Sequence, residues 1–497
     1  MATIWGISIF GCATQAWVAT LGPKYGLRTM ALSRVSLTGC GAQQVAACHR
    51  CAKADPARLD PMQYAGGWPG TFIFSILNIF VQLAYSITTS SKLHTFLHRL
   101  SRSARVSHPV TVLTDSTSLS SVAGAQALHA VNESVSLIVG IVVVSIVVFF
   151  VAAYGYNLIH YVERYAWVLM FAIYCLLCGL LNQGDPDLGL LNNEMDTGRA
   201  KVADLLSWCG IVFSVSSGWC TIAADYNTRL DPKIVPAWRT FAMTWLGTYL
   251  PICFTMTLSA CFQTLTKESY ADALQDNGIG GMAGALLSPL AGFGKFILVI
   301  LAFSTIAANV PNTYSGSLSA QTLHPILMKI PRIFFVILFT IAYLVASIAG
   351  RESFGDIMSD FASILAYYTA IFISVRLRSP SSPCTPSDIV LTFPRTVLQV
   401  MFLEHVWFRR ASGSLGPLNP DDFNTWSKLP PGYACVATIL CCVAFIVPCM
   451  SETWYIGPLA LAVSSPYGGD MGFEVALFGA ILFYGLFRTI EIRIFKR

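Results

Sequence analysis

The sequence predicts an all-α protein with many membrane-spanning helices. Its 497 residues are 55% hydrophobic and 11% charged, whereas soluble proteins average about 25% charged residues. Mean hydropathy is +0.61. A helix needs roughly 20 apolar residues to cross a hydrocarbon layer about 30 Å thick, and stretches of that length recur along the chain. So much apolar surface does not fit in one soluble core, so we expect a single polytopic domain over residues 1–497 within the lipid bilayer.

Eleven stretches are long and apolar enough to span a bilayer, and each is bounded by charged residues, proline or glycine. The predicted spans are residues 4–21, 68–90, 135–154, 164–182, 204–223, 239–262, 286–308, 331–349, 354–376, 433–451 and 472–490. An odd number of spans fits poorly with two equivalent halves, so one span is expected to be missing at the start.

The charges of the loops predict the orientation. Basic loops, such as those at 24–34 and 229–239, alternate with acidic loops at 185–196 and 268–276. Cytoplasmic loops carry an excess of Lys and Arg. The C-terminus, which ends Phe-Lys-Arg, is therefore predicted to be cytoplasmic, and the first residues are predicted to lie outside.

Two segments depart from this regularity. Residues 35–63 show neither a helical nor a strand period, and residues 92–120 carry Lys92, Arg99 and Arg102 on the side that the alternation places outside. They can be flexible loops or inserts foreign to the fold. We favour inserts derived from translated introns, because Val35-Ser36 can be encoded by a donor-like sequence and Gln63 by an acceptor-like codon.

Two predicted spans carry polar breaks, at 216–219 (Ser-Ser-Gly-Trp) and at 309–312 (Asn-Val-Pro-Asn). Such residues persist at bilayer depth where they line a cavity or bind something, which indicates a carrier. Gly218 lets the backbone approach a ligand, and Pro311 is expected to disrupt its helix. The alternatives are an interfacial tryptophan at 219 and a helix cap at 309–312.

The side chains at these breaks suit a planar heterocycle. Trp219 can stack on a ring, and the amides of Asn309 and Asn312 offer both a donor and an acceptor to its edge. Asn78 and Gln82 lie four residues apart on one helical face. Helix–helix hydrogen bonding in lipid is the alternative for both. We favour Asn78 as a further ligand contact and leave Gln82 open between the two roles.

Other classes of function lack their signatures. Neither His-Glu-x-x-His nor Gly-x-Ser-x-Gly occurs, so we expect no enzyme, no catalytic residue and no cofactor. The Cys48–Cys51 cluster has no second ligand pair at zinc spacing, so no metal site is expected. The fifteen cysteines lie mostly in apolar spans and predict no disulfide framework. A channel would be expected to show a repeated polar ring or pore loop, which we do not find.

Five segments carry a family resemblance. In chain order they are 21–28 (Leu-Gly-Pro-Lys-Tyr-Gly-Leu-Arg), 160–167 (His-Tyr-Val-Glu-Arg-Tyr-Ala-Trp), 218–227, 309–315 and 404–409. Together they resemble the fungal purine–cytosine permeases of the nucleobase:cation symporter-1 family. Removing residues 35–63 would join Ser33-Arg34 to Tyr64–Gly70, which is similar to a further pattern of that family.

The resemblance implies twelve spans in a five-plus-five inverted repeat of the LeuT type, followed by two helices. Against that pattern we expect this chain to lack the family's first span, which in the family supplies part of the substrate and ion site, so a non-functional truncated permease is one alternative.

The resemblance also implies a proton symporter in the plasma membrane that imports cytosine, adenine, guanine and hypoxanthine, with no nucleic-acid partner. Pyridoxine or a nucleoside is the alternative substrate. Glu163, Asp225, Asp356 and Asp360 are the candidates for proton coupling, and the sequence does not choose among them. For Glu163 and Asp225 we favour the alternative of an ion pair at the inner gate or in a loop.

Overall fold

The computed structural model describes residues 2–25, 67–88, 137–154, 156–186, 198–323 except 228, 229, 232, 263 and 266, 327–350, 354–372, and 431–495 except 453, 466 and 467. Within these ranges the chain is helical, with two isolated antiparallel bridges, Pro186–Leu265 and Ser451–Ile456. The predicted inserts at 35–63 and 92–120, and the motif at 404–409, lie outside the described residues.

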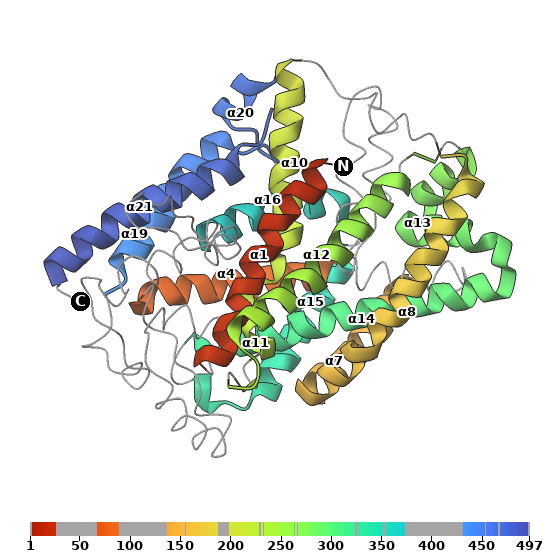
Figure 1. Cartoon of the computed structure of the whole chain (residues 1–497), viewed down its shortest axis with the longest axis horizontal. Helices are drawn as coiled ribbons and strands as arrows, with labels where there is room; N and C mark the ends of the chain where they lie inside the picture. The colour runs from red at the N-terminus through yellow and green to blue at the C-terminus, as the bar shows by residue number, and fades with distance from the viewer. Residues whose placement is uncertain are drawn as a thin grey trace.

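The described helices are shown in Figure 1. The α-helices are α1 (Ala2–Tyr25), α4 (Gly67–Thr88), α7 (Leu137–Tyr154), α8 (Tyr156–Leu180), α10 (Arg199–Ser217), α11 (Ala223–Asn227), α12 (Ala237–Phe262), α13 (Glu268–Leu287), α14 (Ala291–Thr322), α15 (Arg332–Gly350), α16 (Phe354–Phe372), α19 (Tyr433–Ile446), α20 (Pro458–Val463) and α21 (Gly472–Phe495). Short 3-10 helices include η4 (Gly218–Thr221), η5 (Ser288–Leu290) and η11 (Val447–Cys449).

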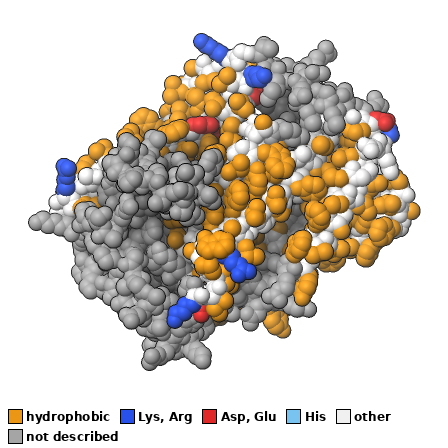
Figure 2. Space-filling view, in the orientation of Figure 1, with side chains coloured by type: hydrophobic (Ala, Val, Ile, Leu, Met, Phe, Trp, Pro, Cys, Tyr) orange, Lys and Arg blue, Asp and Glu red, His pale blue; other side chains and the backbone are white. Residues whose placement is uncertain are grey.

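The predicted class, an all-α membrane protein, is confirmed. Each predicted span falls on a helix, and six helical stretches in the described residues are long and apolar enough to cross a bilayer. Five more apolar helices there are shorter. Large apolar side chains such as Phe80, Leu338 and Leu482 are more than half exposed. Figure 2 shows hydrophobic side chains over much of the described part of the visible face, with only a few charged residues among them. Such a surface is suited to lipid.

The helix that carries the 309–312 motif differs from the prediction. We expected a span at 286–308 that Pro311 disrupts, but α14 runs without interruption from Ala291 to Thr322, with Pro311 inside it. Membrane helices tolerate proline because neighbouring groups re-satisfy the freed backbone. Asn309 and Asn312 therefore lie well inside a helix, and the alternative of a helix cap is wrong. The acidic stretch at 268–276, predicted as a loop, begins helix α13.

The break at Ser216–Trp219 is confirmed. Helix α10 ends at Ser217, and the chain continues as the 3-10 helix η4 before α11 begins at Ala223. Serine hydroxyls compete for backbone carbonyls here. Ser216 Oγ donates to the Val212 carbonyl at 2.7 Å, and Ser217 Oγ donates to the Phe213 carbonyl at 2.6 Å. Such bonds bend helices, and Gly218 provides no side chain to oppose the tighter winding.

Two helices organise the packing. The long helix α14 contacts α4, α7, α8, α13 and α15, and α1 lies against α10, η4, α11 and α12 (Figure 1). Helices α19 and α21 form a closely packed pair. Arg332, at the start of α15, connects three helices. Its Nη2 donates to the carbonyls of Ala152 and Ala153 in α7, at 3.2 and 3.1 Å, and its guanidinium lies 4.6 Å from the Tyr314 ring centroid of α14.

Glycine permits a close approach of α1 to the end of α10. A Cβ atom added at Gly11 would lie 1.9 Å from Ser216 Oγ, whereas one added at Gly6 in the same helix meets nothing within 4 Å. The contact at Gly11 therefore holds α1 directly beside the break at Ser216–Trp219.

We predict that Gly11→Ala destabilises the protein, because the added methyl group separates α1 from α10 at a cost of about 1–3 kcal/mol. Gly6→Ala is the matched control. It should be neutral or stabilising by about 0.5–1 kcal/mol, since alanine favours a helix over glycine. Thermal unfolding of the purified chain in detergent measures both. Equal unfolding midpoints for the two variants would contradict the close approach.

Candidate functional site

The 3-10 helix η4 directs three consecutive side chains to three different surroundings. A 3-10 helix has three residues per turn, so neighbouring side chains point about 120° apart. Cys220 is fully buried within hydrogen-bonding reach of Thr14 on α1. Thr221 Oγ1 accepts a hydrogen bond from Gln82 Nε2 of α4 at 3.4 Å. Trp219 is 37% exposed, and its ring centroid lies 5.9 Å from that of Tyr226 on α11. Trp219 therefore keeps an accessible aromatic surface while its two neighbours anchor the turn.

Asn78 and Gln82 form a buried amide pair on α4. Gln82 Nε2 donates to Asn78 Oδ1 at 3.2 Å, and Asn78 Nδ2 donates to Ser319 Oγ of α14 at 2.8 Å. Neither side chain is exposed. The pair thus forms a hydrogen-bonded chain from η4 through α4 to α14. The predicted shared face is confirmed. Hydrogen bonding between helices, the alternative raised for both residues, is what the structure shows for Asn78 and Gln82.

Helix α14 carries a polar stripe. Asn309, Asn312, Ser315 and Ser319 follow one another at intervals of three or four residues, so they lie on one face of the helix. All four are buried. Ser319 accepts from Asn78, as described above, and Ser315 lies one turn closer to Asn312. The stripe therefore faces the helices that carry the other candidate residues.

Asp225, which lies in α11, forms a hydrogen bond with the polar stripe of α14. Ser315 Oγ donates to Asp225 Oδ2 at 3.0 Å, and the Asp225 side chain is only 6% exposed. Three residues separate Asp225 from the end of η4, so the bond fixes the segment that follows Trp219 against the helix that carries Asn312. The side chains of Glu163, Asp356 and Asp360 lie outside the described part of the chain.

Aromatic contacts give a second connection between the two motifs. Tyr226, which touches Trp219, also packs against the apolar cluster that contains Val310, Tyr314 and Leu318 of α14. Tyr314 is the residue beneath the Arg332 guanidinium. The structure therefore brings the elements that carry Trp219, Asn78, Gln82, Asn309 and Asn312 together. A single cavity shared by Trp219 and Asn312 stays a prediction.

Sequence reasoning missed the hydroxyl partners. Thr221, Ser315 and Ser319 complete the network, but serine and threonine are common in membrane helices. One signal was present: Ser315 and Ser319 follow Asn312 at helical spacing. It could not be used while the helix was expected to end near residue 308.

The arrangement can bind a flat polar ring. An exposed indole provides a stacking surface, and the neighbouring helices supply amide and hydroxyl groups that both donate and accept hydrogen bonds. One buried carboxyl group, that of Asp225, accepts a hydrogen bond from Ser315 of α14.

Comparison with known proteins gives close sequence relatives. No family model matches the chain. It is 31% identical over 381 residues to the purine-cytosine permease fcyB of Emericella nidulans, and 31% identical over 351 residues to the purine-cytosine permease FCY2 of Saccharomyces cerevisiae. These alignments cover 76% and 70% of this chain, 68% of fcyB and 60% of FCY2. The vitamin B6 transporter TPN1 of Saccharomyces cerevisiae is 28% identical over 406 residues, which cover 76% of this chain and 69% of TPN1.

Solved structures were compared as well. One similar structure is that of Mhp1, a nucleobase-cation-symport-1 family transporter in a closed conformation with bromovinylhydantoin bound. The alignment covers 98% of this chain and 93% of the Mhp1 chain, with a TM-score of 0.47 and 15% sequence identity. The sequence relationship to fcyB extends over more than two thirds of each chain. The resemblance noted in the sequence is thereby confirmed, and the chain belongs to the purine–cytosine permease family.

Proposed function

We propose that this protein is a secondary transporter that carries cytosine and purine bases across the plasma membrane together with protons. The observation that supports this proposal most strongly is the break at η4. It leaves Trp219 exposed beside helices whose amide side chains are buried, in a chain of the permease family. Cytosine, adenine, guanine and hypoxanthine are all planar, with donors and acceptors on their edges. The C-terminus is proposed to be cytoplasmic because of its basic residues.

Trp219 would hold the base by stacking, and the polar stripe of α14 would read its edge. Asn312 retains 7% of its surface exposed, whereas Asn309, Asn78 and Gln82 have none. We therefore assign the direct edge contact to Asn312, and to Asn78 and Gln82 the task of holding α14 beside η4. A base with the wrong edge would leave a buried amide unpaired, which costs about 1–3 kcal/mol.

Asp225 is the carboxylate that we propose for proton coupling. An ionisable group at bilayer depth is a functional candidate by default. Asp225 joins the segment after Trp219 to α14 through Ser315. Protonation would weaken the charge-assisted character of this bond and so change how α11 is held against α14.

Uptake of radiolabelled cytosine by cells that lack their own permeases tests the proposal. We expect uptake that unlabelled adenine, guanine and hypoxanthine inhibit and that a more acidic medium increases. Unlabelled pyridoxine tests the second candidate, which the similarity to TPN1 motivates. A chain that reaches the plasma membrane but accumulates no base would contradict the proposed function.

We predict that Trp219→Ala weakens the apparent affinity for cytosine by about 5- to 150-fold, which corresponds to about 1–3 kcal/mol of aromatic–base stacking. Trp219→Phe should lose less. Trp238, 64% exposed at the start of α12, is the matched control, and Trp238→Ala should leave the affinity unchanged. The measurement is the cytosine concentration at half-maximal uptake. If both alanine variants behave alike, Trp219 has no specific role.

We predict that Asn312→Ala abolishes uptake or weakens it more than Asn312→Gln does, because only an amide keeps both donor and acceptor. Asn182, an exposed residue before α10, serves as control through Asn182→Ala. Surface abundance is measured for every variant by labelling intact cells. Normal uptake by Asn312→Ala would exclude Asn312 from base recognition.

We predict that Asp225→Asn makes cytosine uptake independent of external pH, since the amide cannot exchange a proton. Ser315→Ala removes the hydrogen bond but leaves the carboxyl group, so it should lower the rate and keep the pH dependence. Initial uptake rates at two external pH values separate these outcomes. A full pH response in Asp225→Asn would assign coupling to another group.

A further inference from the structure

A buried amide on α1 lacks hydrogen-bond partners. Gln15 is 1% exposed, and its Nε2 and Oε1 are both covered and both without a partner. In the described part of the chain it is the one amide side chain of which both ends are in this condition. Gln82 of α4 is equally buried and its Oε1 is also unpaired, but its Nε2 donates to Asn78 and to Thr221. Gln15 is therefore unlike the other buried glutamine.

Gln15 lies where α1 meets the turn η4. Gly11, four residues earlier and so on the same helical face, is the glycine at which an added Cβ would lie 1.9 Å from Ser216 Oγ. Thr14, the preceding residue, is within hydrogen-bonding reach of Cys220 of η4. Helix α1 packs against both α10 and η4. The unpaired amide thus belongs to the contact between α1 and the break.

An unpaired amide makes this contact less favourable. In water both ends of the amide are hydrogen-bonded, and a covered amide without partners loses those bonds with no replacement. Hydrocarbon provides neither a donor nor an acceptor. The penalty applies while α1 is packed against η4, and it is relieved when a separation of the two lets water reach the amide. Gln15 therefore opposes the apolar packing that surrounds it.

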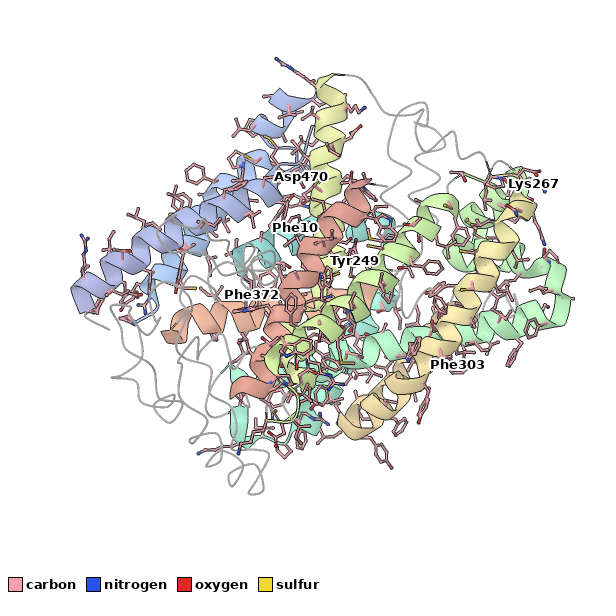
Figure 3. All side chains as sticks on the ribbon, in the orientation of Figure 1. Phe10, Tyr249, Lys267, Phe303, Phe372 and Asp470 are labelled. Atoms are coloured by element: carbon pink, nitrogen blue, oxygen red, sulfur yellow. The ribbon has the colours of Figure 1, made fainter. Side chains whose placement is uncertain are left out.

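The rest of α1 is attached more firmly. Near its start, the carbonyls of Trp5 and Ile9 accept hydrogen bonds from α12 at 3.3 and 3.2 Å. The donor to the first is the hydroxyl of Tyr249, which Figure 3 labels. Near its end, the Ala19 carbonyl accepts a hydrogen bond from α11 at 3.5 Å. Between these points, the side chain of Thr14 meets a thiol, which is a weak hydrogen-bonding group. The middle of α1 is thus its weakest attachment.

We propose that Gln15 keeps the contact between α1 and η4 ready to open. The two elements separate transiently at residues 11–15, while α1 stays attached to α12 and α11. Separation hydrates the amide and uncovers Cys220. Proteins open locally in this way without unfolding as a whole. Because Trp219 lies in η4, the opening loosens the turn that carries the exposed indole.

An apolar side chain of the same length should keep the contact closed. Gln15→Met removes both polar atoms and keeps an unbranched side chain, and methionine adapts to irregular packing. No unpaired amide then remains to be hydrated, so the closed arrangement gains stability. Gln82→Met is the matched control. It leaves Asn78 and Thr221 without their donor, so η4 should loosen.

Reaction of Cys220 with N-ethylmaleimide measures the opening in the purified full chain in detergent, so the experiment needs no transport. Cys220 is 0% exposed and reacts when it is uncovered, and mass spectrometry of its peptide separates it from the other cysteines. When closing is faster than the reaction, the rate is proportional to the open population. We expect Gln15→Met to slow the reaction by about 5- to 150-fold, which corresponds to about 1–3 kcal/mol. Gln82→Met should accelerate it.

Urea separates a local opening from unfolding of the whole protein. A local opening exposes little surface, so its population changes little with urea, whereas global unfolding depends steeply on it. We expect the reaction of Cys220 in the wild-type chain to be nearly constant at urea concentrations below the unfolding transition. A rate that rises with urea as steeply as the unfolding equilibrium would overturn the local opening.

The variants decide whether the unpaired amide is the cause. An unchanged or faster reaction of Cys220 in Gln15→Met would contradict the proposal. The same slowing in Gln82→Met would also contradict it, because any methionine would then act alike. Gln15→Leu is a second apolar variant and should slow the reaction as well. Loss of folding in both Gln15 variants would show that the amide supports the native packing, and the proposal would be wrong.

Discussion

A polar side chain inside a hydrocarbon layer has no water to bind, so it must find its partner within the protein. The described helices are arranged around this requirement. The polar stripe on α14 binds to α4 through Ser319 and to α11 through Ser315. Apolar packing alone discriminates weakly between helix neighbours in lipid. The hydrogen bonds of Asn78 and Asp225 therefore select which helices meet α14, and in which register.

The turn at η4 depends on the same constraint. A helix that ends inside the bilayer exposes backbone groups, and tighter 3-10 winding limits their number. The neighbouring helix α1 comes close enough to cover the turn because Gly11 carries no side chain. Cys220 and Thr221 are then held by α1 and α4, and Trp219 remains exposed.

The protein separates two kinds of polar chemistry. Around α4 and α14 most hydrogen bonds are made by amides and hydroxyls, which keep the same charge at every physiological pH. Before the start of α21, the hydroxyl of Tyr367 contacts the carboxyl groups of Glu452 and Asp470. Amides suit the recognition of a neutral ring, because they neither attract ions nor change with pH.

Much of this could be predicted from the sequence. Hydropathy determined the all-α membrane class, because apolar stretches of about 20 residues match the length of a spanning helix, and a helix satisfies its backbone hydrogen bonds within its own segment. Spacing placed Asn78 and Gln82 on one face, and the Ser-Ser-Gly-Trp motif indicated the break. These inferences are local: they depend on residues within a few positions of one another.

Tertiary structure decided the rest. Whether Pro311 ended α14 depended on how that helix packs among its neighbours, which no local pattern reports. The bonds Asn78–Ser319 and Ser315–Asp225 join residues that lie far apart in the chain. The meeting of Tyr367 with Glu452 and Asp470 also depends on how α16 lies against α21. Hydrophobic periodicity determines which face of a helix is buried, but only the packed helices determine which polar groups meet there.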